Sequence, residues 1–227
     1  MIQLRLAATA LIAGFALAAC GPTEPAGDQI AACGGNDVPA AAQTGGGLSI
    51  QPLQFTCKKL PNGLRVYAMP DANTASVSVA VWYDVGSKDD PQGRSGFAHL
   101  FEHLMFKSTT NMPPENFDRL TEDAGGFNNA STWNDFTNYY ETVPANHLER
   151  VLWGEAERMG SLVIDDANFK SERDVVKEEF RQSILSNPYG KLLGLYLYQS
   201  GFSVHPYGRP GIGSIERTQG RPPNTGT

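Results

Sequence analysis

The chain has 227 residues, of which 41% are hydrophobic, 10% aromatic and 19% charged, a composition typical of a folded protein rather than of a disordered or collagen-like one. Its 18 Lys and Arg residues against 24 Asp and Glu residues give a net charge of −6, which argues against nucleic acid as the main partner. The 3 cysteines, Cys20, Cys33 and Cys57, are too few for a disulfide-built scaffold and include no C-x-x-C pair, which argues against a cysteine zinc site.

Residues 1–19 have the pattern of an export signal. Arg5 precedes an apolar stretch over residues 7–19 that is too short to cross a bilayer as a helix. The segment Leu17-Ala18-Ala19-Cys20 resembles the bacterial lipobox, in which the cysteine is lipidated and becomes the mature N-terminus. The alternative is an ordinary secretory signal with a chance cysteine. With lipidation at Cys20, we expect a protein anchored in the bacterial cell envelope, at the periplasmic face of the outer membrane.

Residues 20–48 are rich in Gly, Ala and Pro and have no apolar periodicity, so they are expected to form a flexible tether. Cys33 lies in this tether and Cys57 lies beyond it. In an oxidising compartment these two cysteines either pair or remain free thiols, because the sequence gives no geometry. We expect a folded domain over residues 49–216, followed by an irregular tail over residues 217–227.

The folded domain begins with two strand signals. Leu60-Pro61-Asn62-Gly63-Leu64 is a turn signal between two short apolar runs, which predicts a β-hairpin. The segment from Ala75 to Val81 alternates between polar or small residues and valines. This period of two predicts a half-buried strand, with one face formed by Val77, Val79 and Val81.

Helical spacing begins at residues 95–107, where Ser95 is the expected N-cap. The i, i+4 pairs of this helix are expected to face inward; they are Phe97 with Phe101 and Leu100 with Leu104. The pattern then predicts a helix over 115–124 ended by Gly125-Gly126, a strand over 136–143, and helices over 145–160, 168–186 and 189–200. These elements predict an α+β fold, a two-layer sandwich of a mainly antiparallel sheet packed with helices.

The first helix carries two of the chain's 4 histidines, in His99-Leu100-Phe101-Glu102-His103. Residues i and i+4 of a helix lie one turn apart on the same face, so both imidazoles can bind one zinc ion. Glu102 lies beside the ion without having to bind it, and a carboxylate there can take a proton from water. The other histidines, His147 and His205, are expected to be a helix-start residue and a loop residue.

A catalytic zinc usually has three protein ligands, and the helix near residues 171–180 offers a third. Glu172 and Glu179 are two turns apart and share a face; Glu179 is the expected ligand, and Glu172 the carboxylate that orients a ligand or the base. A polar surface without metal is the alternative. However, these polar residues interrupt an otherwise apolar helix, where burial without partners is costly, and H-x-x-E-H is a zinc-peptidase motif.

The chain resembles the M16 family of zinc metallopeptidases, the group of insulinase, pitrilysin and the mitochondrial processing peptidases. The resemblance rests on several blocks in the same order: the turn at 60–64, the segment 93–109 with H-x-x-E-H, the segment 125–132, the helix with Glu172 and Glu179, and His205-Pro206-Tyr207-Gly208. It implies one zinc per chain, bound by His99, His103 and Glu179, with Glu102 as the general base and Glu172 as an outer carboxylate.

The resemblance further implies a zinc metalloendopeptidase that binds an extended peptide along an edge strand containing Asn129 and Ala130. A turn role after Gly-Gly is the alternative for Asn129. Family members pair such a domain with a similar second domain, in the same chain or in a partner subunit. Residues 217–227 depart from the family's continuation, and we expect a truncation, a shifted reading frame or a short natural form. The alternative functions are a partner-dependent peptide-binding half and an inactive fragment.

Overall fold

The computed structural model describes residues 55–213. The predicted signal at 1–19, the predicted lipidation site Cys20, the whole predicted tether at 20–48 and the tail at 217–227 lie outside the described residues. Cys57 lies within the described residues and takes part in a disulfide. The other two cysteines of the chain, Cys20 and Cys33, lie outside the described residues. No helix between residues 55 and 213 has the length and apolarity that a membrane crossing needs.

The chain divides into two compact units, the first ending at Asp71 and the second beginning at Ala72. The described part of the first unit is an antiparallel β-hairpin, in which β1 (Thr56–Lys59) pairs with β2 (Arg65–Ala68). The connecting turn is closed by the amide of Leu60, which donates to the carbonyl of Leu64 at 2.8 Å. The sequence prediction of a hairpin at this turn is therefore confirmed.

The second unit is built on a three-stranded antiparallel sheet with the order β3-β6-β5. Its strands are β3 (Ser76–Tyr83), β5 (Phe127–Thr132) and β6 (Thr137–Pro144). The central strand β6 pairs with β3 from Ser76 opposite Pro144 to Tyr83 opposite Thr137, and with β5 from Phe127 opposite Thr142 to Thr132 opposite Thr137. The valines of β3 lie on its less exposed face, as the alternation predicted.

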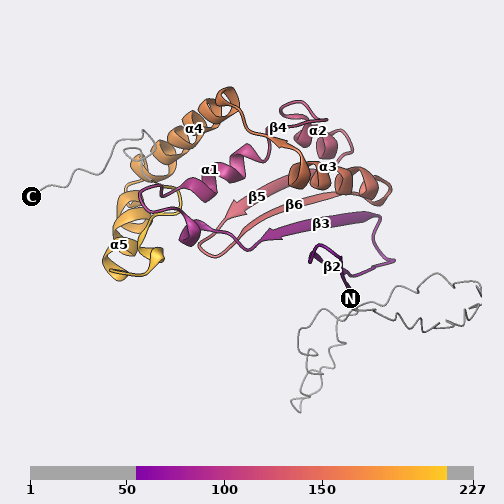
Figure 1. Cartoon of the computed structure of the whole chain (residues 1–227), viewed down its shortest axis with the longest axis horizontal. Helices are drawn as coiled ribbons and strands as arrows, with labels where there is room; N and C mark the ends of the chain where they lie inside the picture. The colour runs from indigo at the N-terminus through magenta and orange to yellow at the C-terminus, as the bar shows by residue number, and fades with distance from the viewer. Residues whose placement is uncertain (1–54, 214–227) are drawn as a thin grey trace, which may run out of the picture. The chain divides into compact units, whose positions relative to one another are not determined.

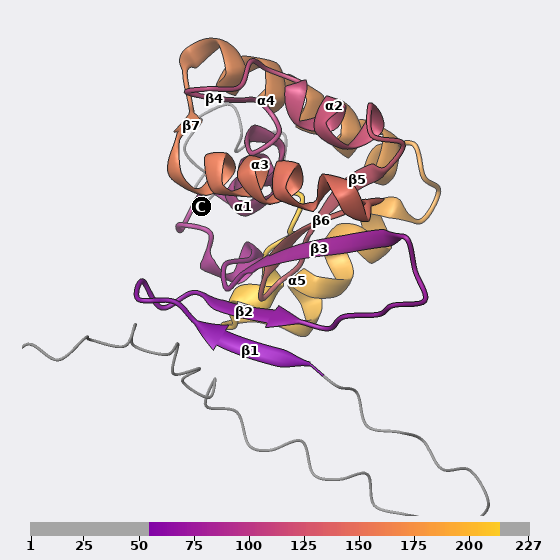
Figure 2. The ribbon, with the colours of Figure 1, turned by 90° about the vertical axis from the view of Figure 1, so that its right-hand side faces the viewer.

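One face of this sheet is covered by helices α1 (Phe97–Leu104), α2 (Asn116–Glu122) and α3 (Leu148–Gly160) (Figures 1 and 2). Helix α4 (Asp166–Phe180) packs against α1 and continues into π-helical turn η3 (Arg181–Leu185). The remaining short elements are listed in chain order: η1 (Ser87–Asp89), β4 (Ser108–Thr109), η2 (Ala145–His147), β7 (Leu162–Val163), η4 (Leu192–Tyr196), α5 (Leu197–Gly201) and η5 (Pro206–Gly208). The predicted α+β class with an antiparallel sheet is confirmed.

Apolar contacts hold the helices together at two places. Between α1 and α4, Leu100, Leu104 and Val176 form a buried cluster. Around α2, a second cluster contains Met112, Phe117 and Leu120. Helix α3 approaches α2 closely at Gly154, where a Cβ atom would lie 2.7 Å from a Leu120 methyl group. A larger residue at this position would therefore force the Leu120 side chain to move.

A polar triad lies in the core between α3 and the sheet. Glu141 and Arg158 are each 1% exposed, and Glu155 is 2% exposed. The guanidinium carbon of Arg158 lies 3.6 Å from the ring centre of Phe117 and 4.4 Å from that of Tyr139. Burial raises the pKa of Glu141 to about 9, and its interaction with the Glu155 carboxylate adds to the rise. Glu141 therefore holds a proton at neutral pH.

Two expectations about the first helix are wrong. Ser95 does not cap it, because the helix begins after Gly96, whose φ of 90° no Cβ-bearing residue adopts readily. Asp90 caps it instead, through side-chain oxygens that accept the amides of Gly96 at 2.7 Å and Ala98 at 2.8 Å. Phe101 does not face inward but is 37% exposed, because the core takes up only the Leu100 side of the helix.

Candidate metal centre

Helices α1 and α4 lie side by side (Figure 1). They bring three predicted ligands together. Glu179 Oε2 lies 3.5 Å from His99 Nε2 and 3.4 Å from His103 Nε2. The two imidazole rings are perpendicular, with centres 4.9 Å apart, as the i, i+4 spacing on one helix face allows. The three ligand atoms lie within 4.8 Å of one another, so they converge on one small volume.

The spacing of these atoms fits a zinc ion. A tetrahedral zinc ion with ligand bonds of about 2.0–2.2 Å holds its ligand atoms about 3.4 Å apart, close to the two distances from Glu179. Two imidazole nitrogens and one carboxylate oxygen are also a donor set that catalytic zinc sites use. All three side chains are partly buried rather than fully exposed, which separates this group from an ordinary acidic surface.

The electrostatics of the group favour a cation. Burial lowers the pKa of His99, which keeps its imidazole neutral and able to bind a metal. Burial also opposes protonation of His103, but the hydrogen-bonding interaction with Glu179 and the charges of Glu179, Glu102 and Glu172 outweigh it and raise the pKa of His103. The same interaction with His103 lowers the pKa of Glu179. The carboxylates of Glu179, Glu102 and Glu172 thus give the group a negative potential that favours a bound cation.

Glu172 lies next to Nδ1 of His103, the ring nitrogen that does not face Glu179. Its Oε2 is 3.5 Å from His103 Nδ1, and its Oε1 is 2.7 Å from Lys107 Nζ. The side chain of Glu172 is only 7% exposed, so its charge depends on this lysine for compensation. A carboxylate on the far nitrogen of a ligand histidine fixes the orientation and tautomer of the ring, which is the position expected for Glu172.

Glu102 lies on the same helix but outside the three-ligand group. The hydroxyl of Thr132, at the end of β5, donates to Glu102 Oε2. This contact joins α1 to the sheet and holds one oxygen of the carboxylate. The other oxygen remains available to accept a proton, as the expected general base requires.

The start of α1 is held by a loop more than a hundred residues later in the chain. Arg209 donates to the carbonyl of Asp90 at 2.6 Å and to that of Lys88 at 2.5 Å. Gly96 touches the backbone of Gly213 so closely that a Cβ on Gly96 would lie 2.8 Å from Gly213 Cα. The loop therefore fixes the segment with the capping carboxylate Asp90, and through it the first turn of α1, which carries His99.

The predicted substrate strand is an edge strand. β5 pairs with β6 along one side, and no other strand within residues 55–213 pairs with its second side. The amide of Trp133 donates to the carbonyl of Phe136 at 2.8 Å, so the alternation of the ladder directs the backbone groups of Asn128, Ala130 and Thr132 to the free side. The Ala130 amide is bonded to Asn129 Oδ1 at 2.8 Å.

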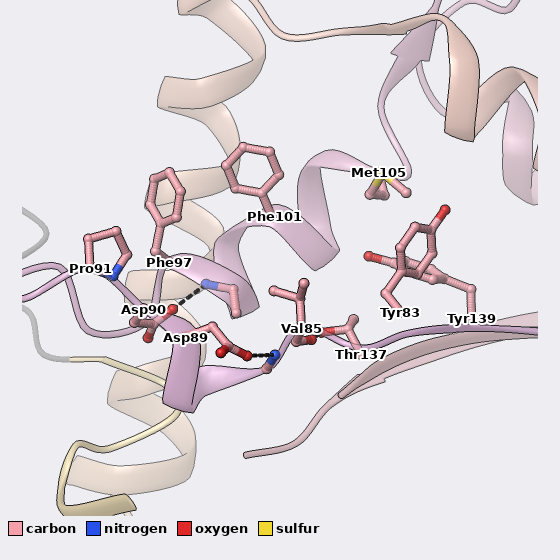
Figure 3. A pocket seen from close by; sticks show the side chains of 12 residues that line it. Tyr83, Val85, Asp89, Asp90, Pro91, Phe97, Phe101, Met105, Thr137 and Tyr139 are labelled. Atoms are coloured by element: carbon pink, nitrogen blue, oxygen red, sulfur yellow. Dashed lines mark hydrogen bonds between the residues drawn. The ribbon is translucent and has the colours of Figure 1, made fainter. Parts of the chain in front are cut away.

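An open apolar pocket of about 340 Å³ lies between α1 and the sheet (Figure 3). Phe97, Phe101 and Met105 line it from α1 or just beyond, and Tyr83 and Tyr139 line it from the sheet. Its two carboxylates already accept backbone amides, Asp89 from Gly86 and Asp90 from Gly96 and Ala98. Both carboxylates of the pocket are therefore engaged, and none of the three candidate zinc ligands lines it.

The sequence reasoning gave no role to three residues that shape this centre. Lys107 could have been found, because it lies four residues after His103 and so near the same face. Thr132 belongs to a block that supported the family resemblance, but its contact with Glu102 depends on the placement of β5. No sequence pattern around Asp90 indicates that its side chain caps α1. His147 begins α3, as expected, and His205 lies in a loop before η5; neither joins the centre.

Comparison with known proteins identifies related sequences. The model of the insulinase family, peptidase family M16, matches residues 65–214. The zinc protease PqqE of Helicobacter pylori is 39% identical over 161 residues, which are 70% of this chain and 36% of that protein. A probable mitochondrial-processing peptidase subunit beta of Arabidopsis thaliana is 28% identical over 160 residues, 70% of this chain and 30% of that protein.

A solved structure is also similar to this chain. The crystal structure of a protease from Helicobacter pylori matches with a TM-score of 0.71 and 36% identity, over 75% of this chain and 41% of the other. The present chain therefore spans about a third of the length of the sequence relatives it matches.

Proposed function

We propose that this chain, which belongs to the insulinase family of peptidases, family M16, is a zinc-dependent metalloendopeptidase that hydrolyses peptide bonds in peptides or unfolded protein segments. The observation that carries the proposal is the convergence of His99, His103 and Glu179 on one point, with Glu102 held beside them by Thr132. Three ligands and an adjacent, separately held carboxylate are what metal-assisted hydrolysis requires.

The residues of the site have three roles: binding zinc, transferring protons, and orienting the side chains that do so. His99, His103 and Glu179 would bind the zinc ion, which when bound supplies the Lewis acidity that polarises a peptide carbonyl and acidifies water. Glu102 takes the proton from the attacking water and then gives it to the leaving amine. Thr132 holds one oxygen of Glu102, and Glu172 orients the His103 ring.

The substrate would lie along β5. The free edge offers the backbone groups of Asn128, Ala130 and Thr132, to which an extended peptide can add as a further strand. Because Thr132 also contacts Glu102, a peptide on this edge would run past the general base. Asn129 Oδ1 has to leave the Ala130 amide before a substrate carbonyl can take its place.

For the location and assembly of the protein, we propose a lipid anchor at Cys20, attachment to the cell envelope, and a second M16-like domain or chain as partner. The signal pattern before Cys20 supports the anchor. The greater length of the relatives and the description of one of them as a subunit support the partner. The alternative functions are a peptide-binding half that is inactive without its partner and an inactive fragment.

Metal analysis with matched glutamate variants tests the centre. We expect one zinc per wild-type chain and a loss of most of the metal in Glu179→Gln. The control Glu178→Gln, next to it and exposed, should keep the metal. Equal zinc contents in the two variants would contradict the ligand assignment.

Activity is tested separately on an unfolded protein substrate. Glu102→Gln should keep its zinc and lose at least about 10²-fold in rate, the usual loss for a removed general base. A wild-type chain that binds zinc but cleaves only after a second M16-like chain is added would support the partner-dependent alternative. A zinc-loaded chain inactive in both conditions would refute the proposed peptidase activity.

A further inference from the structure

The hydroxyl that contacts Glu102 belongs to a pair of threonines at the end of the β5–β6 hairpin. Thr132 lies opposite Thr137 in the register, and the amide of Trp133 donates to the carbonyl of Phe136 at 2.8 Å. Along such a ladder, pairs that share backbone hydrogen bonds alternate with pairs that do not, and side chains lie closest in the latter. The two threonines form a pair of the latter kind, so Thr137 is the direct cross-strand neighbour of the Thr132 side chain.

The hydroxyl of Thr137 has two acceptors. It donates to the carbonyl of Val85 at 2.9 Å and, less closely, to Oγ1 of Thr132 at 3.5 Å. Val85 lies between β3 and η1, and Figure 3 shows it next to Thr137. Because Thr137 is only 6% exposed, water does not readily replace its hydroxyl. The hydroxyl of Thr137 therefore joins β6 to the segment before η1 and faces Thr132 as a donor.

The direction of these hydrogen bonds determines where Thr132 directs its own proton. A hydroxyl group has one proton to donate and two lone pairs that accept. The proton of Thr137 is directed toward Val85 and Thr132, so Thr132 accepts on this side. Its own proton is then left for Oε2 of Glu102, to which it donates. The two hydroxyls thus form a chain that runs from Thr137 through Thr132 to Glu102.

We propose that Thr137 is a positioning residue for Glu102 and acts through Thr132. Its hydroxyl keeps the Thr132 hydroxyl directed at one carboxylate oxygen of Glu102, so the other oxygen stays in a fixed position to exchange a proton. The catalytic consequence rests on the proposed function, in which Glu102 is the general base. The structural part does not, because the position of the Glu102 carboxylate can be measured without any catalysis.

A purely structural role in the sheet is the alternative for Thr137, because threonine is common in strands. Valine is β-branched like threonine, so Thr137→Val removes the hydroxyl and keeps most of the packing. Thr142 on the same strand provides a matched control, because its hydroxyl lies 2.9 Å from that of Ser78 and Thr142→Val also removes a hydroxyl pair. Residues 137 and 142 point to opposite faces of the sheet, so only the first substitution should affect Glu102.

The test is the NMR signal of the Glu102 carboxyl carbon, in the full chain labelled with carbon-13 at its glutamate carboxyl groups. Glu102→Gln identifies this signal by its absence. We expect Thr132→Val to shift the signal and Thr137→Val to shift it in the same direction. Thr137→Ser, which keeps the hydroxyl, and the control Thr142→Val should leave it at the wild-type position. Because Thr137 acts through Thr132, the double variant should show no larger shift than Thr132→Val alone.

An unchanged Glu102 signal in folded Thr137→Val would overturn the proposal, as would an equal shift in Thr142→Val. A double variant with the sum of the two single shifts would also overturn it, because Thr137 would then act independently of Thr132. Circular dichroism shows whether each variant is folded. If Thr137→Val does not fold, Thr137→Ser and Thr137→Ala differ only by the hydroxyl oxygen, and equal Glu102 signals in these two would overturn the proposal.

Kinetics on an unfolded protein substrate measure the catalytic consequence, with a partner chain added if the wild type needs one. Thr137→Val should lower kcat about five- to tenfold, the equivalent of one hydrogen bond, and leave KM and zinc content unchanged. A loss in KM or zinc content alone would show that the hydroxyl does not act on the general base. A wild-type chain without peptidase activity would refute the proposed function, whereas the carboxyl signal would still decide whether Thr137 positions Glu102.

Discussion

The buried triad of Glu141, Glu155 and Arg158 makes the stability of this fold depend on pH. Within residues 55–213, the carboxyl oxygens of Glu141 and Glu155 have no hydrogen-bond partner, and the guanidinium of Arg158 stands 3.4 Å from Glu155 and 3.9 Å from Glu141 without hydrogen-bond geometry. Protonation of Glu141 removes one of the two negative charges that face Arg158 and supplies a donor for the Glu155 carboxyl group. We therefore predict that Glu141→Gln, which replaces the protonated acid by a neutral amide, is tolerated.

The size of the effect follows from the pKa of Glu141, which is about 9 in the folded protein against an ordinary 4.5. Between these values the folded state holds a proton that the unfolded state releases, so wild-type stability falls as the pH rises through this window. The slope is at most about 1.4 kcal/mol per pH unit. Between pH 5 and pH 8 the wild type should therefore lose up to about 4 kcal/mol relative to Glu141→Gln.

Urea unfolding followed by tryptophan fluorescence measures this difference at several pH values between 5 and 8, with a chelator present so that metal binding does not contribute. The two proteins should be similar at pH 5, and Glu141→Gln should be the more stable at pH 8. Glu149→Gln, an exposed substitution on α3, should follow the wild-type curve. Parallel curves for wild type and Glu141→Gln would refute the raised pKa of Glu141.

Three further predictions concern other parts of the chain. Lys107→Met should weaken zinc binding about tenfold, measured by chelator competition, because Glu172 loses its 2.7 Å ammonium partner. Arg209→Lys should lower the free energy of unfolding by about 1–2 kcal/mol, measured by urea titration, because one ammonium cannot reach both carbonyls. Cys20→Ser should move the protein from the membrane to the soluble envelope fraction, measured by cell fractionation, and an unlipidated wild-type N-terminus in a mass spectrum would contradict this anchor.

The parts of the site that lie within one helix could be predicted from the sequence. His99 and His103 depend only on the i, i+4 geometry of α1, and Glu172 and Glu179 only on a two-turn repeat in α4. The strand β3 was predicted from its valine alternation for the same reason. In each case, the period of the regular structure fixes which side chains share a face, and no distant contact is needed.

Contacts between distant segments could not be predicted in this way. Ser95 is a chemically good N-cap, but Asp90 reaches the same amides from outside the helix, which depends on the path of the preceding loop. Phe101 has the spacing of an inward residue, yet the strands opposite leave an open pocket there. Thr132 reaches Glu102 only because β5 runs along α1.

The metal centre is therefore held by different segments at the two ends of α1. At the beginning, Asp90 and Arg209 fix the turn that carries His99. At the end, Glu172 lies 3.5 Å from His103 Nδ1 and is itself held by Lys107. A change in the loop at Arg209 should consequently disturb His99 more than His103, whereas a change at Lys107 should do the reverse. Since both imidazoles face the same oxygen of Glu179, a shift at either end of the helix is enough to separate the ligand atoms.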